Sequence, residues 1–135
     1  MGHPIIYIDG QEGTTGLRIR DLLARRDDLE LRLIASEERK DLEARRQLLD
    51  EADVAILCLP DVAAAEALEL LSPGSGTRVI DTSTARRVHP DWIYGLPELS
   101  PDQREAIRTA PRVANCGCYP VGFILAVRPL IEAGL

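Results

Sequence analysis

The chain has 135 residues, 45% of them hydrophobic and 4% aromatic, which is enough to build the core of one domain. Its formal net charge of −6 argues against nucleic acid or an anionic membrane as the main partner. The three cysteines do not form a disulfide framework, and Cys116 and Cys118 are too close for an unstrained disulfide and too few for a zinc site. With no signal peptide and no membrane span in the pattern, we expect a cytoplasmic domain that holds no metal.

Residues 4–26 predict a strand, a glycine-rich loop and a helix. Residues 4–9 are almost wholly apolar, as in a strand that is buried on both faces of a parallel sheet. In the following loop one glycine permits a tight turn, the next lets the backbone approach a pyrophosphate, and the last allows close packing of helix on sheet. We therefore expect the loop and the first helical residues to bind a dinucleotide, through Gly10, Gly13, Thr14, Thr15 and Gly16. The glycine spacing matches the generic fingerprint loosely, so an ordinary glycine turn is the alternative.

Strands and helices continue to alternate along the rest of the chain. The hydrophobic pattern predicts strands at residues 30–35, 53–59, 78–81 and 112–114. It predicts helices at residues 40–50, 62–71 and 100–109 and from residue 118 onward, and it leaves residues 94–99 as a loop. Such alternation indicates an α/β, Rossmann-like fold with a doubly wound parallel sheet. Ligands of these sheets bind at the carboxyl ends of the strands.

The end of the second predicted strand bears on the choice of dinucleotide. NAD sites place an acidic residue about 20 positions beyond the glycines, where it holds the ribose 2′-hydroxyl. Here a hydroxyl at Ser36 is followed by the cations Arg39 and Lys40, which suit a 2′-phosphate. We therefore expect NADP rather than NAD, and we expect Leu59 and Pro60 at the end of the third strand to border it. The alternative is a solvated charged loop.

Residues 81–87, after the fourth predicted strand, combine hydroxyl groups with two arginines. Ser83, Arg86 and Arg87 could hold an anionic substrate, because guanidinium groups bind phosphate and carboxylate well. A capped surface turn with solvated arginines explains the same residues. His89 follows in what we interpret as a loop, since nothing in its spacing connects it to a reactive group.

The segment 112–122 places a cysteine at the start of the last helix. A short apolar run and a tight turn lead to Cys118, and Pro120 suits the first turn of a helix. The positive end of the helix dipole favours a thiolate, and free backbone N–H groups there could stabilise an oxyanion. The segment therefore predicts a nucleophile that forms a thioester. The alternative is a small apolar residue in the core.

Together these residues resemble the N-acetyl-gamma-glutamyl-phosphate reductases of arginine biosynthesis, in their shorter variant, within the semialdehyde dehydrogenase superfamily. The resemblance rests on the glycine loop 10–16, the turn 36–41, and the segments 81–87, 92–99 and 115–120. It implies NADPH-dependent reduction of N-acetyl-glutamyl 5-phosphate to N-acetyl-glutamate 5-semialdehyde and phosphate, through a cysteine thioester. It also implies a homo-oligomeric enzyme.

The resemblance assigns the catalytic role to Cys118 and places Asn115 on the substrate side with Ser83, Arg86 and Arg87. Cys116 stands where the family usually has proline.

The resemblance also implies two domains. Residues 1–117 correspond to the NADP-binding domain, and residues 118–135 correspond to the cysteine helix that leads into a second, α+β domain. In the family that domain supplies a histidine acid/base, so we expect it to be missing after Leu135 and the chain alone to be inactive. Two other interpretations stay open. One is a non-enzymatic, redox-responsive NADP-binding module, and the other is an enzyme of the aspartate-semialdehyde dehydrogenase type.

Overall fold

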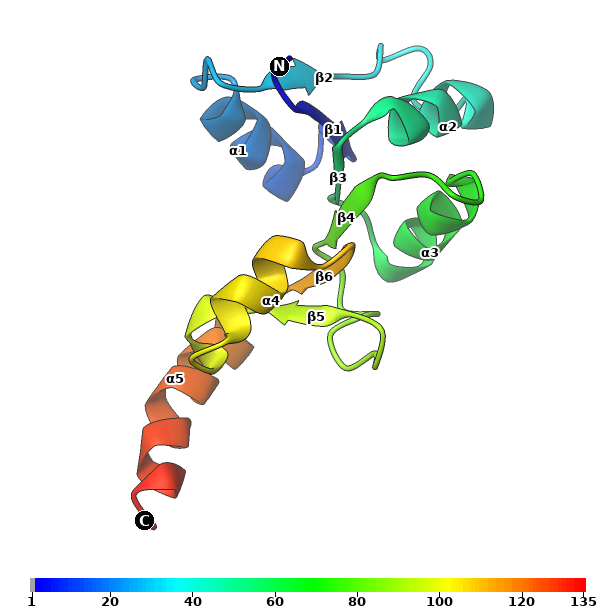
Figure 1. Ribbon diagram of the computed structural model, residues 1–135. Helices are drawn as coiled ribbons and strands as arrows, with labels where there is room; N and C mark the ends of the chain where they lie inside the picture. The colour runs from blue at the N-terminus through cyan, green and yellow to red at the C-terminus, as the bar shows by residue number, and fades with distance from the viewer. Residues whose placement is uncertain (1) are drawn as a thin grey trace.

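Strands and helices alternate along the chain in the computed structural model, which describes residues 2–135 (Figure 1). The strands are β1 (Ile5–Asp9), β2 (Glu30–Arg32), β3 (Val54–Leu57), β4 (Arg78–Asp81), β5 (Ile93–Gly95) and β6 (Arg112–Asn115). The helices are α1 (Thr14–Leu23), α2 (Leu42–Glu51), α3 (Asp61–Leu70), α4 (Gln103–Thr109) and α5 (Cys118–Glu132), with a 3₁₀ helix η1 (Pro97–Leu99).

The six strands form one parallel sheet in the order β2-β1-β3-β4-β6-β5. Figure 1 shows α2 and α3 on one side of this sheet and α1 and α4 on the other, which confirms the predicted doubly wound fold. The chain moves from β1 to β2 in one direction and crosses back to β3 in the other. The strand order therefore reverses at β1, and the crevice above its carboxyl end is the expected ligand site.

The core lies between the sheet and the helices α2 and α3. Its largest fully buried apolar side chains include Tyr7, Leu49, Leu57 and Val79. Alanines on the inner face of α3 are also fully buried, and their small size lets that helix lie close to the strands. Packing of this kind fixes β1 and β3 against each other and aligns their carboxyl ends, where Asp9 pairs with Leu57.

Two predicted strands end earlier in the structure than the apolar pattern indicates. β2 stops at Arg32, because the backbone of Ile34 is hydrogen-bonded by the side chain of Gln11 instead of by a neighbouring strand. β3 stops at Leu57, and the next residues turn into α3, whose N-cap is Pro60. The helix expected at 100–109 begins only at Gln103, because residues 100–102 form a bend and a turn that lead from η1 into α4.

The prediction of a loop at residues 94–99 was wrong at its beginning, which belongs to β5, and at its end, where residues 97–99 form η1. Ile93–Gly95 form β5, an edge strand that pairs in parallel with β6. Three residues are too few for a period-2 pattern to be visible in a sequence. β5 can approach β6 closely because Gly95 has no side chain. A Cβ at this position would lie only 3.0 Å from the Ala114 carbonyl oxygen.

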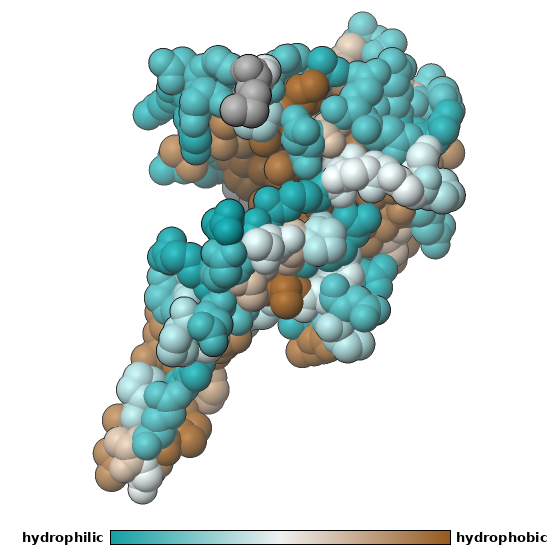
Figure 2. Space-filling model, viewed as in Figure 1, coloured by the Kyte–Doolittle hydropathy of each residue, from teal (hydrophilic) through white to brown (hydrophobic). Residues whose placement is uncertain are grey.

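Helix α5 extends away from the sheet and contacts η1 (Figure 1). None of its residues is buried, and large apolar side chains such as Phe123 and Ile131 are about two-thirds exposed. Figure 2 shows this surface as brown along the projecting arm of the molecule. Among residues 2–135, no helix is long and apolar enough to cross a bilayer.

Candidate functional site

A cavity of about 280 Å³ opens over the carboxyl end of β1, at the point where the strand order reverses. Its walls come from the loop after β1, the segment after β2, helix α2 and the start of α3. They are lined by Asp9, Gly10, Gln11, Glu12, Gly13, Ile34, Arg39, Lys40, Arg45, Leu59 and Ala63. Five of the residues predicted to bind the cofactor are therefore gathered around one cavity: Gly10, Gly13, Arg39, Lys40 and Leu59.

The glycine loop has the geometry that the sequence predicts. Gly10 has a φ of +87°, and a Cβ there would lie 2.3 Å from the Cys58 carbonyl oxygen. A Cβ on Gly16 would lie 2.1 Å from the Gly10 carbonyl oxygen, so only glycine lets α1 approach the loop this closely. Gly13 is the N-cap of α1. No side chain caps that terminus, and its first turn carries no acidic residue. Thr14 and Thr15 are the first residues of the helix.

Gln11 clamps the glycine loop onto the segment that follows β2. Its side-chain amide donates to the Ile34 carbonyl oxygen at 2.9 Å and accepts from the Ile34 N–H at 3.0 Å. The Gln11 side chain is buried, so both groups of the amide are satisfied inside the protein. The clamp brings Glu12, the next residue of the loop, to Ser36 and Arg39. Glu12 accepts a hydrogen bond from Ser36 Oγ at 2.9 Å and forms an ion pair with Arg39.

A buried ion pair below the cavity was missed by the sequence analysis. Asp9 Oδ2 accepts from Arg45 Nη2 at 2.7 Å and from Nε at 3.3 Å, and both side chains are about nine-tenths buried. The hydroxyl of Tyr7 is buried nearby, and no described residue forms a hydrogen bond with it. Burial, followed by the negative charge of Asp9, raises the pKa of Tyr7 far above its usual value. An aspartate that ends an apolar strand is a signal for such a pair, since buried carboxylates need a partner.

The loop after β4 is held by two aspartates. Asp81 accepts from the backbone N–H of Ser83 at 2.8 Å and from its hydroxyl at 2.9 Å. Asp61, at the start of α3, accepts from the Thr84 hydroxyl and the Thr84 N–H. These two donors, the hydroxyl first, lower the pKa of Asp61. Ser83 is thus buried, with its hydroxyl engaged inside the loop.

Arg87 links this loop to the turn that precedes Cys118. Its Nε donates to the Asn115 carbonyl oxygen at 3.2 Å, and Nη2 donates to the Thr82 carbonyl oxygen at 3.4 Å. The guanidinium lies against Gly117, where a Cβ would come within 2.6 Å of Nη1. Arg86 also comes from this loop, and its Nε is buried without a hydrogen-bond partner. The structure therefore brings the predicted cation Arg87 to the residue next to the predicted nucleophile.

The three cysteines are free and occupy different environments. Cys118 is exposed at the first residue of α5 and is not part of the core described above. Cys116 is half-buried, and its carbonyl oxygen accepts from the Asn115 side chain at 3.2 Å. Cys58, at the end of β3, is half-buried, and burial raises its pKa to about 11.

The predicted loop around His89 is confirmed. His89 lies between β4 and β5, where its Nδ1 accepts from the Asp91 N–H at 3.3 Å. Within residues 2–135, no group of three or more His, Cys, Asp or Glu side chains is arranged to hold a metal ion.

A glycine loop at a helix N-terminus, above the reversal point of a parallel sheet, defines a dinucleotide-binding domain of the Rossmann type. The family model described as "Semialdehyde dehydrogenase, NAD binding domain" matches residues 6–109, and the chain belongs to this family. This confirms the superfamily that the sequence resembles and supports a nicotinamide dinucleotide as the cofactor.

The matching relatives carry a more specific name than the family model does. Proteins named N-acetyl-gamma-glutamyl-phosphate reductase from Brucella ovis and Brucella canis are each 58% identical to this chain over 132 residues. The alignment covers 98% of this chain and 43% of each relative, so the chain spans less than half the length of these proteins.

Two solved structures share the fold. Aspartate semialdehyde dehydrogenase II from Vibrio cholerae, complexed with ASA, is 22% identical with a TM-score of 0.68, over 98% of this chain and 47% of that one. Aspartate semialdehyde dehydrogenase from Francisella tularensis is 18% identical with a TM-score of 0.74, over 98% and 42%. At these identities the likeness concerns the fold alone.

Proposed function

We propose that this chain carries the cofactor site and the nucleophile of an N-acetyl-gamma-glutamyl-phosphate reductase. In that reaction, N-acetyl-glutamyl 5-phosphate is reduced to N-acetyl-glutamate 5-semialdehyde and phosphate, with NADPH as the reductant. The observation that carries the proposal is the exposed Cys118 at the N-terminus of α5, directly after Gly117, against which the Arg87 guanidinium lies. The name of the 58% identical relatives supports the choice of substrate.

Cys118 acts as the nucleophile in this proposal. Its thiolate attacks the acyl carbon, the bond from that carbon to the phosphate oxygen breaks, and phosphate leaves with the electron pair. The product is a thioester on Cys118, and this covalent step divides one difficult reaction into two easier ones. The unbonded N–H groups at the start of α5 are suited to stabilise the oxyanion that forms during the attack.

The cavity above β1 is the proposed cofactor site, and its residues fit a dinucleotide. The uncapped terminus of α1, with Gly13, Thr14 and Thr15, suits the pyrophosphate.

The choice of dinucleotide rests on the segment after β2. A 2′-phosphate is suited by Ser36, Arg39 and Lys40, so we propose NADP over NAD. Leu59 lines the cavity and Pro60 follows it at the start of α3. When bound, the cofactor supplies the hydride that reduces a thioester to an aldehyde.

The anionic groups of the substrate are proposed to lie near the loop after β4. Arg87 is held against Gly117, the residue before Cys118, where its positive charge suits a phosphate leaving group. Arg86 comes from the same loop and is proposed to lie on the substrate side with Arg87. Ser83 and Asn115 complete the proposed substrate side.

The test compares serine substitutions at the two neighbouring cysteines in the protein expressed from its complete gene. The assay is phosphate-dependent reduction of NADP by N-acetyl-glutamate 5-semialdehyde, the reverse reaction. We expect Cys118→Ser to abolish turnover and Cys116→Ser to keep most of it. A Cys118→Ser protein that retains turnover would contradict the assignment of the nucleophile.

A further inference from the structure

The side chain of Glu12 bonds two of the side chains proposed above to bind a 2′-phosphate. Its Oε1 accepts from Ser36 Oγ at 2.9 Å, and its Oε2 is paired with Arg39 Nη1. Ser36 and Arg39 are two of the three residues assigned above to the 2′-phosphate. One carboxylate therefore engages both a hydroxyl and a guanidinium that an incoming phosphate would contact.

The placement of Glu12 follows from the way the loop is built. The buried amide of Gln11 binds both backbone groups of Ile34, so the glycine loop and the segment after β2 are held together beside Glu12. Glu12 and Arg39 also line the same cavity, together with Lys40. The approach of Glu12 to Ser36 is thus fixed by the backbone.

The side chains themselves can still exchange partners. Glu12 and Arg39 are 42% and 52% exposed, and exposed ion pairs of this kind contribute little stability. A phosphate carries more negative charge than a carboxylate and can bind a guanidinium through two oxygens, so it can displace Glu12 from Arg39. The displaced carboxylate would then stand close to the bound phosphate, and like charges repel.

We propose that Glu12 is a specificity-determining residue that weakens the preference of this site for NADP over NAD. Its carboxylate competes with the 2′-phosphate of NADP for Ser36 and Arg39. The ribose 2′-hydroxyl of NAD instead has a hydrogen to donate to the same carboxylate. The proposal rests on the proposed function only in that a nicotinamide dinucleotide binds in this cavity.

The experiment measures dissociation constants for NADP, NAD and adenosine 2′,5′-bisphosphate by calorimetry. Glu12→Gln keeps the size of the side chain and removes its charge, and we expect it to tighten NADP and the bisphosphate about three- to tenfold. Binding of NAD should stay unchanged or weaken. The matched control is Glu37→Gln, because Glu37 is an exposed carboxylate of the neighbouring turn that bonds neither Ser36 nor Arg39. The control should leave the ratio of the two affinities unchanged.

A double-mutant cycle separates this effect from a general change of charge. In an Arg39→Ala background, Glu12 has lost its ionic partner, so Glu12→Gln should give a clearly smaller gain for NADP. An unchanged NADP-to-NAD ratio in Glu12→Gln, or an equal rise in Glu37→Gln, would overturn the proposal. A native chain that binds NAD more tightly than NADP would refute the assignment of NADP as the cofactor. In that case, a higher affinity for NADP relative to NAD in Glu12→Gln would still support the role of Glu12. Failure of the native chain to bind either dinucleotide would overturn both.

Discussion

At the scale of single residues, the three cysteines have the same side chain but differ in how far they are exposed. Cys118 is exposed at a helix N-terminus, whereas Cys58 is half-buried with a pKa of about 11. Only the thiolate reacts with iodoacetamide, so the raised pKa of Cys58 slows its labelling, and exposure favours Cys118. These differences lead to a labelling prediction.

We expect Cys118 to be alkylated first near neutral pH, with Cys116 slower and Cys58 slowest. Partial labelling followed by mass spectrometry of the peptides measures the order, and Cys118→Ser serves as the control. Labelling of Cys58 should become appreciable only as the pH approaches about 11. If Cys116 reacted before Cys118, the cysteine that replaces the usual proline of the family would be the more reactive thiol.

A second prediction concerns the buried pair of Asp9 and Arg45. Arg45→Leu would leave the Asp9 carboxylate buried without its partner, because both side chains are about nine-tenths buried. Loss of one member of a buried ion pair typically costs about 3–5 kcal/mol, and the adjoining cavity favours the lower end. Urea unfolding should therefore show a loss of about 3 kcal/mol.

The double variant Asp9→Asn with Arg45→Leu should recover part of this loss, since it removes the uncompensated charge. A single Arg45→Leu variant as stable as the native chain would show that water solvates Asp9 from the cavity.

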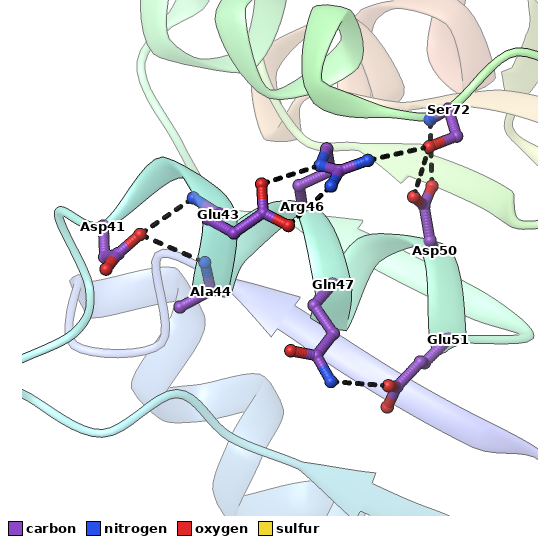
Figure 3. A network of polar contacts seen from close by, with 8 residues as sticks. All are labelled: Asp41, Glu43, Ala44, Arg46, Gln47, Asp50, Glu51 and Ser72. Carbon is purple, nitrogen blue, oxygen red and sulfur yellow. Dashed lines mark hydrogen bonds and ion pairs between the residues drawn. The ribbon is translucent and has the colours of Figure 1, made fainter.

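At the scale of elements, hydrogen bonds at both ends of α2 fix its position (Figure 3). Asp41 caps the N-terminus by accepting from the N–H groups of Glu43 and Ala44. At the other end, Asp50 accepts from the Ser72 N–H at 2.9 Å and from its hydroxyl at 2.6 Å, which joins α2 to the loop after α3. Because α2 also carries Arg45, these contacts help to hold the floor of the cavity.

The link between Asp50 and Ser72 predicts a dependence of stability on pH. The two Ser72 donors, the hydroxyl first, lower the pKa of Asp50 in the folded chain. A carboxyl group with a lowered folded pKa stabilises the fold above its unfolded pKa of about 3.9, and this contribution is lost as the pH falls through the folded pKa. Ser72→Ala should therefore lower stability at pH 7 and have a smaller effect near pH 2. Urea unfolding at both values tests this, and equal losses at both pH values would contradict it.

At the scale of the whole molecule, the 135 residues are expected to bind cofactor without significant turnover. His89 is hydrogen-bonded within its own loop, and His3 precedes β1. Absence of a general acid/base typically costs about 10²–10⁴-fold in rate. Incomplete positioning of the substrate adds to this, because orientation can supply roughly 7–11 kcal/mol of a barrier.

The measurement is the reverse reaction, with the 135 residues and the product of the complete gene assayed side by side and dinucleotide binding as the control for folding. Comparable turnover in both would show that a residue within 1–135, such as His89, acts as the base.

The exposed surface of α5 leads to a prediction about association. Large apolar side chains, among them Phe123 and Ile131, lie on a helix that projects from the sheet. Exposed apolar patches of this kind drive self-association. Sedimentation velocity should show a sedimentation coefficient that rises with concentration, and a Phe123→Glu, Ile131→Glu variant should reduce the rise. A native chain that stays monomeric at high concentration would contradict this prediction.

The sequence by itself determined the order of most elements, and it predicted a ligand site at the end of the first strand, where the structure has a cavity. The apolar run of β1, the glycines of the loop and the cysteine that begins α5 are local patterns, and each depends on residues that are neighbours in the chain. The edge strand β5 could not be predicted in this way, since its three residues become a strand only by pairing with β6.

Only the tertiary structure decided which charged groups meet. Asp9 and Arg45 are 36 positions apart, and Glu12 and Arg39 are 27 apart, so no periodicity connects them. The sequence indicated that Ser36 and Arg39 suit a 2′-phosphate, but no local pattern indicated that Glu12 bonds both. Side-chain partners depend on how the loops fold over the strand ends, and that geometry exists only when the sheet has assembled.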